Sequence, residues 1–133
     1  MIKKLVHRHR RGAAAVELAI VTPVLLTMLF GIIEYGWVFT VRQAIVTAAR
    51  EGARTAALPA ATQDDVLARV NAYVQPLGLT TCTTDVGADE SGRPSGVVTV
   101  SIPYADVSLV GCYFGNVDGT LQSTCSMRKE AVE

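Results

Sequence analysis

The sequence predicts an α+β fold, in which a long amino-terminal transmembrane helix is followed by a short helix and a small three-stranded antiparallel sheet. Residues 18–41 contain one charged residue, Glu34, and a helix of about 20 apolar residues is enough to cross the hydrocarbon core of a bilayer. A later segment, residues 62–77, has apolar positions at helical spacing. Three further segments combine threonine and β-branched residues with turn signals between them, which is typical of strands. These are residues 79–86, 97–104 and 120–128.

The charges predict how the chain faces the membrane. The formal net charge is zero, but a cluster of cations precedes the apolar segment. This cluster is Lys3, Lys4, Arg8, Arg10 and Arg11. Basic residues next to a span stay on the cytoplasmic side, so we expect the amino terminus in the cytoplasm and the carboxyl-terminal part to be exported. An ordinary secretory signal is disfavoured because its apolar region is about 7 to 15 residues long. Nucleic-acid binding is not indicated.

The chain is expected to fall into three parts: a leader over residues 1–12, a rod over residues 13–58 and an exported head over residues 59–133. The leader is short, basic and expected to be unstructured. The helix should continue past the membrane to Leu58, because residues 42–58 are rich in helix formers and lack proline. Pro23 removes one backbone hydrogen bond, so a kink or an unwound turn is expected near residues 18–23.

Small residues recur along the second half of this rod. Ala44, Ala48 and Gly52 lie four residues apart, and a second series runs beside them. Such a stripe permits close approach of another helix. An alanine-rich helix with a solvated charged face is the alternative, since alanine is also the best helix former. We favour an interface with another subunit, because the sequence offers the rod no partner within its own chain.

The head begins where Pro59 ends the rod. Thr62 is expected to cap a second helix, with Asp64 and Asp65 in its first turn, where the helix dipole favours negative charge. The apolar face of this helix should cover the sheet. The first two strands flank the polar residues 87–96 and predict a hairpin. In the third strand one face carries alternate residues, namely Leu121, Ser123, Cys125 and Met127.

Three cysteines lie in the part that we expect to be exported: Cys82, Cys112 and Cys125. Disulfides persist in the periplasm and outside the cell, so one bridge and one remaining thiol are expected. The three possible pairings stay open on sequence grounds. We favour Cys112, in the loop of residues 105–119, with either strand cysteine.

Nothing in the exported part predicts catalysis, and we expect no cofactor or metal. It lacks histidine, the commonest general base. The carboxylates of the span are more informative, because a charge in a membrane is expensive and usually has a partner. Glu34 either lies at the outer interface beside Tyr35 or makes a specific contact. Glu17 either pairs with the leader arginines or, after a cut behind Gly12, with the new amine at Ala13.

Several stretches together resemble a known family. They are RRGAAAVEL at residues 10–18, EYG at 34–36, AAREGAR at 48–54 and SMRKE at 126–130. The first is similar to the class III leader of type IV pilins, and the set is similar to TadE-like minor pilins, or pseudopilins, of the Tad (Flp) pilus. The resemblance covers residues 10–58 well and the head loosely. Leu18 follows Glu17 where other Flp-type pilins have tyrosine, which favours a TadE-like protein over a major pilin.

The resemblance implies that an inner-membrane prepilin peptidase cuts between Gly12 and Ala13, and that Glu17 supports processing or meets the amino terminus of a neighbouring subunit. The implied protein is a non-enzymatic minor pilin-like subunit acting in pilus biogenesis through helix packing and head contacts. Its implied partners are other pilin subunits, the inner-membrane assembly platform and membrane lipid. Its expected assembly helix contains Glu34, Tyr35, Ala48 and Gly52.

Three alternatives remain on sequence grounds. The first is an unprocessed, single-pass envelope scaffold or interaction protein. The second is an enzyme or ligand-binding domain on a membrane anchor, which the absence of a convergent polar cluster disfavours. The third is a pseudopilin of type II secretion, which the proline in the rod and AAREGAR make less similar.

Overall fold

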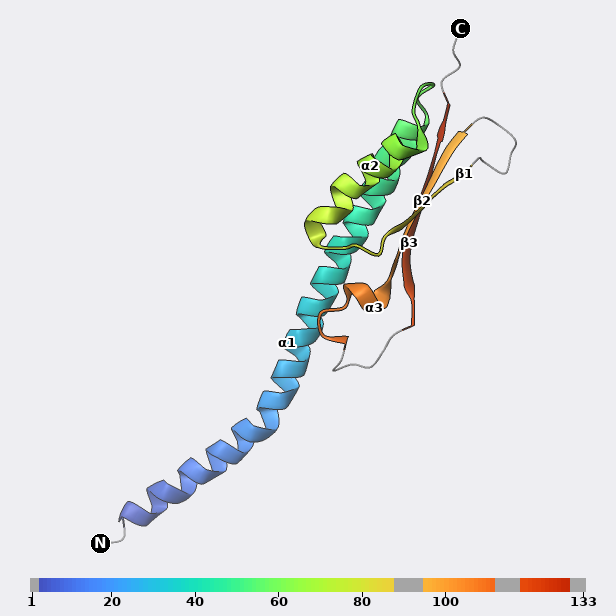
Figure 1. The fold of residues 1–133 in the computed structure, drawn as a ribbon. Helices are drawn as coiled ribbons and strands as arrows, with labels where there is room; N and C mark the ends of the chain where they lie inside the picture. Colours follow the sequence, from blue (N-terminus) through green and yellow to red (C-terminus); the bar gives the residue numbers. More distant parts are fainter. Residues whose placement is uncertain (1–2, 88–94, 112–117, 130–133) are drawn as a thin grey trace. The chain divides into compact units, whose positions relative to one another are not determined.

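The computed structural model describes residues 3–87, 95–111 and 118–129 of the chain (Figure 1). The elements follow the order helix, helix, two strands, a single helical turn and a third strand, which confirms the α+β prediction. The chain divides into two compact units, residues 1–35 and 36–133. We call the second unit the head; it includes the last part of the rod, which the sequence analysis had placed outside the head.

The first helix, α1, runs over Lys3–Ala56 and ends two residues earlier than expected. It begins ten residues earlier than expected, so the prediction of an unstructured leader is wrong. Lysine, leucine, arginine and alanine are good helix formers. Because such residues flank Gly12 on both sides, a single glycine does not end the helix.

The helix also passes through Pro23, and no unwound turn interrupts residues 18–23. The hydroxyl of Thr22 donates to the carbonyl oxygen of Leu18 at 2.6 Å, and that of Thr27 donates to the carbonyl oxygen of Pro23 at 2.7 Å. These side chains satisfy their own hydrogen-bonding groups on the helix backbone, which is the usual solution for hydroxyls in an apolar helix.

The second helix, α2, covers Gln63–Val74 and begins as predicted, with Thr62 as its cap. The Thr62 hydroxyl accepts from the backbone N–H of Asp65, and the Asp65 carboxylate accepts from the backbone N–H of Thr62 at 2.9 Å. These two bonds form a capping box. The hydrogen bonds from the Thr62 backbone and hydroxyl hold the pKa of Asp65 below its usual value of 3.8. A short 3-10 turn, η1 (Gln75–Leu77), then ends at Gly78, whose φ of 73° suits glycine.

The sheet consists of β1 (Thr83–Gly87), β2 (Ser95–Pro103) and β3 (Thr120–Arg128), in that order and antiparallel throughout. The predicted hairpin between the first two strands is confirmed by their pairing. β1 is shorter than expected, whereas β3 has the expected bounds. The outward face is rich in hydroxyls: Thr99 lies opposite Thr124, and their Oγ1 atoms are 2.9 Å apart.

The hydrophobic core lies within the head, where α2 and the end of α1 cover one face of the sheet (Figure 1). Its main contributors are Val41, Ile45, Ala48, Ala49 and Ala53 of α1, Val66, Val70 and Val74 of α2, and Val98, Val100 and Ile102 of β2. At Gly96 the central strand approaches the helix so closely that a Cβ would lie 2.7 Å from the Cβ of Ala56. Glycine is required at this crossing.

The disulfide prediction is not supported. Cys82 and Cys125 are free thiols, and Cys112 lies outside the described residues. Cys125 is paired with Val98 of β2, whereas Thr83, next to Cys82, is paired with Ser101 on the other side of β2. The two cysteines are therefore separated by two strand spacings and several residues along the sheet, well beyond the Cα separation of about 7 Å that a disulfide can bridge.

Candidate assembly surface

The part of α1 between Gly12 and Phe30 is exposed at every position. Its side chains are nevertheless almost all apolar. The large exposed ones in this unit are Val16, Leu18, Ile20, Val21, Val24, Leu25, Leu26, Met28, Leu29, Phe30, Ile32, Ile33 and Tyr35. Soluble monomers rarely expose so large a contiguous apolar area, so this surface requires a lipid or protein environment. By length and composition the helix can cross a membrane, which suggests a single-pass anchor.

The residues expected to serve processing lie at the start of this surface. Gly12 and Glu17 are exposed on α1, and nothing lies within 4 Å of the position that a Cβ on Gly12 would take. Glu17 is four residues beyond Ala13, so the two share one face of the helix, about one turn apart. A carboxylate at this spacing lies close to the place where an amine at Ala13 would be.

Glu34 and Tyr35 differ sharply in exposure. Glu34 is 9% exposed, whereas Tyr35 is 76% exposed. The two neighbouring side chains therefore have different surroundings, and the choice between an interfacial position and a specific contact for Glu34 stays a prediction. Tyr35 retains the exposure expected of an aromatic residue near a membrane surface.

Ala48 and Gly52 occupy a different environment from the one expected. The premise that the rod has no partner within its own chain is wrong, because Ala48 is completely buried and Gly52 faces α2 and β2. A Cβ on Gly52 would lie 2.8 Å from Cγ2 of Val70 and 3.1 Å from Cγ1 of Val98. The stripe of small residues does serve close packing, but the packing partners are the chain's own second helix and sheet.

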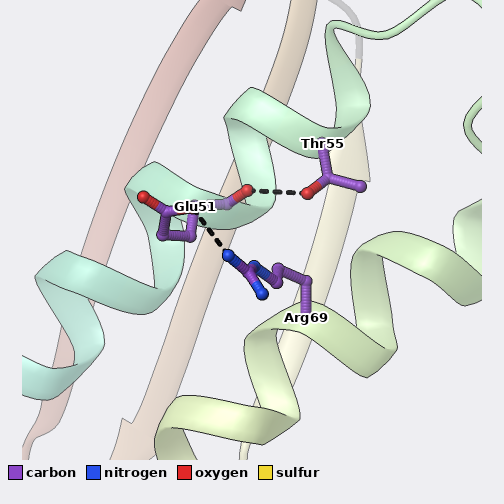
Figure 2. A network of polar contacts seen from close by, with 3 residues as sticks. All are labelled: Glu51, Thr55 and Arg69. Atoms are coloured by element: carbon purple, nitrogen blue, oxygen red, sulfur yellow. Dashed lines mark hydrogen bonds and ion pairs between the residues drawn. The ribbon is translucent and has the colours of Figure 1, made fainter.

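A groove of about 640 Å³ runs between α1 and α2 on the surface of the head. Arg69 of α2 donates to the carboxylate of Glu51 at 3.3 Å, and the Thr55 hydroxyl donates to the Glu51 carbonyl at 3.0 Å (Figure 2). The lining of the groove contains two cations, Arg54 and Arg69, and two carboxylates, Glu51 and Asp65. These charges balance, and the groove lining contains no nucleophile beside a general base. The ion pair is solvent-exposed and links the two helices weakly.

One contact that sequence analysis missed holds the single helical turn α3 (Tyr104–Val107) to the rod. The indole Nε1 of Trp37 donates to the carbonyl oxygen of Val107 at 2.9 Å. The two residues are far apart in the sequence, and no local pattern links them. The Thr81 hydroxyl also donates to the Asp106 carboxylate at 2.6 Å, which links the same turn to the segment before β1.

Among the residues that the structure describes, no three histidine, cysteine or acidic side chains come together as a metal site.

Comparison with known proteins finds a family that matches part of α1. The family described as TadE-like protein matches residues 12–54, which begin at Gly12 and end with AAREGAR. Residues 12–54 of the rod are similar to this family. The match covers about a third of the chain and stops before α2, so it concerns the span and the part of α1 that enters the head. No curated protein and no solved structure matches the chain significantly.

The TadE-like match supports a pilin-like protein associated with the Tad pilus. The family is structural and non-enzymatic, and other pilin subunits are the partners that it suggests. The matched segment contains both halves of α1, the exposed apolar half and the half buried in the head. The TadE-like signature therefore includes residues that the chain needs for folding as well as residues open to partners.

Proposed function

We propose that this chain is a minor pilin-like subunit of a Tad-type pilus assembly, inserted in the inner membrane with its amino terminus in the cytoplasm and its head on the outer side. The observation that carries the proposal is the TadE-like rod whose apolar half is exposed throughout. Lipid covers this surface before assembly, and helices of other subunits cover it within the pilus base or filament. Each Å² of apolar surface removed from water contributes about 25 cal/mol. Contact with lipid or with other subunits is therefore strongly favoured over exposure to water.

Processing removes residues 1–12 in this proposal. The prepilin peptidase must bind the chain around Gly12 in an unwound form, and glycine weakens a helix by about 1 kcal/mol relative to alanine. The open surroundings of Gly12 also leave room for the enzyme. Cleavage then creates an amine at Ala13, and Glu17 of the same or a neighbouring subunit neutralises its charge within the membrane.

A glycine substitution with a matched control tests this step. Gly12→Leu should abolish cleavage, because the side chain occupies the backbone approach that the peptidase uses. Gly31→Leu changes a second glycine of the same helix that also has open space around it, and it should be cleaved normally. Immunoblots of cells with the peptidase report the shift between precursor and mature forms. Normal cleavage of Gly12→Leu would contradict Gly12 as the cleavage site, whereas a wild-type chain that stays at precursor size in the presence of the peptidase would favour an unprocessed membrane scaffold.

A further inference from the structure

The head carries few exposed large apolar side chains in the part that the structure describes. They are Phe39 at 53%, Leu58 at 51% and Leu109 at 58% exposed. A single exposed leucine is ordinary on a protein surface. The position of Leu109 is the informative feature, because the chain next to it is attached to α1 at Trp37, near the end of the apolar run.

Trp37 makes this attachment. Its indole nitrogen donates to the carbonyl oxygen of Val107, and Val107 is itself 1% exposed within the core. Leu109 is two residues further along, so its Cα lies within about 7 Å of the Cα of Val107. The turn between them is held firmly, because the N–H of Ser108 donates to the Tyr104 carbonyl at 3.0 Å. Leu109 is thus fixed near the level of Trp37 on the rod.

The length of the span places that level relative to the bilayer. A helix needs about 20 residues to cross the hydrocarbon core, and the headgroup region adds about 5 to 7 Å on each side. If the roughly 20 residues in the hydrocarbon core begin at Ala13, they end near Ile32. If they begin at Leu18, after the charge of Glu17, they end near Trp37. Trp37 and the segment that it holds therefore lie between the edge of the hydrocarbon and the headgroups.

The surrounding side chains suit this layer. Phe39 is exposed two residues beyond Trp37, and Arg42, the first cation after the apolar run, is exposed about 7 Å further along the helix. Aromatic and aliphatic side chains partition to the interface, and an arginine at this height meets lipid phosphates. The third exposed apolar residue, Leu58, lies beyond the far end of α1, about 30 Å from Trp37 along the helix axis.

We propose that residues 108–110, directly after α3, form a membrane-seating element, in which Leu109 inserts into the outer interface of the bilayer and holds the head against the lipid surface. This inference rests on the single-pass insertion proposed above. The partner is phospholipid at the boundary between headgroups and acyl chains. Trp37 follows the apolar span directly along α1, which is why we propose lipid and not a second protein as the partner of Leu109.

Photo-crosslinking of the full chain in vesicles of phosphatidylethanolamine and phosphatidylglycerol tests the proposal. The benzophenone amino acid p-benzoylphenylalanine is placed at Leu109, at Leu58 as the matched water-exposed control, or at Leu29 within the span. After irradiation, intact mass should show one added phospholipid at Leu109 and at Leu29, with a severalfold lower yield at Leu58.

The other outcomes separate the two proposals. Lipid adducts at Leu29 with a yield at Leu109 no higher than at Leu58 would overturn the seating element and leave the insertion intact. An adduct of Leu109 to a second copy of the chain in place of lipid would overturn it equally, since protein would then cover this surface. The absence of lipid adducts at Leu29, with protein that does not float with the vesicles, would overturn the insertion and the seating element together.

Discussion

Gly52 is the residue at which α1 comes closest to α2 and to the central strand. The β-branched side chains of Val70 and Val98 line its surroundings, and such side chains are stiff at χ1. Arg54, two residues further, is exposed. Two residues of one helix therefore differ entirely in the size of side chain that they tolerate.

Gly52→Ala should lower the stability of the head. The added methyl meets Val70 Cγ2 at 2.8 Å, and overpacking of this kind costs about 1 to 3 kcal/mol, which outweighs the helix-propensity gain of about 1 kcal/mol. Gly36→Ala is the matched control, because nothing lies within 4 Å of its Cβ position. Thermal unfolding in detergent should show a lower Tm for the first variant and an equal or higher Tm for the second. Equal increases in both would contradict the packing at Gly52.

Asp65 provides a prediction of pH dependence. Its pKa is lowered by hydrogen bonds from Thr62, so its contribution to stability is complete above the unfolded pKa of 3.8 and is lost as the pH falls through the lower folded pKa. The Tm difference between the wild type and Asp65→Asn should be constant above pH 3.8 and shrink in more acidic solution. Asp64→Asn, outside the capping box, should show a smaller difference. A gap for Asp65→Asn that widens in acid would contradict the capping role.

At the scale of elements, the sheet register determines the chemistry of the cysteines. Cys82 and Cys125 both point to the helix-covered side and are partly buried against the core. Burial raises the pKa of the Cys82 thiol, although a contact with Thr84 opposes this. Thiolate is the reactive form, so a raised pKa makes this cysteine slow to react.

Peptide mapping without reductant should therefore find no Cys82–Cys125 bridge in folded protein. Alkylation of Cys82 at neutral pH should be slower in the folded chain than after denaturation, because the folded state disfavours its thiolate. A Cys82–Cys125 linkage in a protein that retains its native Tm would require a different strand order from the one described.

Local patterns predicted most of the elements and some of the site. Thr62 with Asp65 marked the start of α2, and alternation placed Leu121 and Met127 on one face of β3. The exposed apolar rod was also predictable, since its composition alone requires a nonaqueous environment. The partners of Ala48 were not, because spacing shows that a helix packs closely without showing against what. That information lies in Val70 and β2, which are distant in the sequence.

At the scale of the whole molecule, the two halves of α1 have separate roles. The half up to Tyr35 exposes the apolar surface that we propose lipid and other subunits cover, while the half from Val41 contributes to the core of the head. Substitutions in the two halves should have distinguishable effects. A substitution at an apolar position of α1 that impairs assembly and leaves the head folded is expected in the first half.

Leu25→Ala and Ala48→Leu test this separation. Leu25 is 58% exposed and Ala48 is 0% exposed. Leu25→Ala should keep the Tm of the head and reduce crosslinking to other pilin subunits, because it removes apolar surface from the interface. Ala48→Leu should lower the Tm, by an amount reflecting about 1 to 3 kcal/mol of overpacking, and reduce the amount of folded protein. An unchanged Tm for Ala48→Leu would restore that residue as a possible contact between subunits.

The mature amino terminus tests the central claim most directly. The protein is isolated from membranes of cells with and without the prepilin peptidase, and its terminal peptide is identified by mass spectrometry. The account predicts a terminus at Ala13 when the peptidase is present and an intact chain from Met1 when it is absent. A terminus at Met1 in the presence of an active peptidase would contradict the account and indicate an unprocessed membrane-anchored protein.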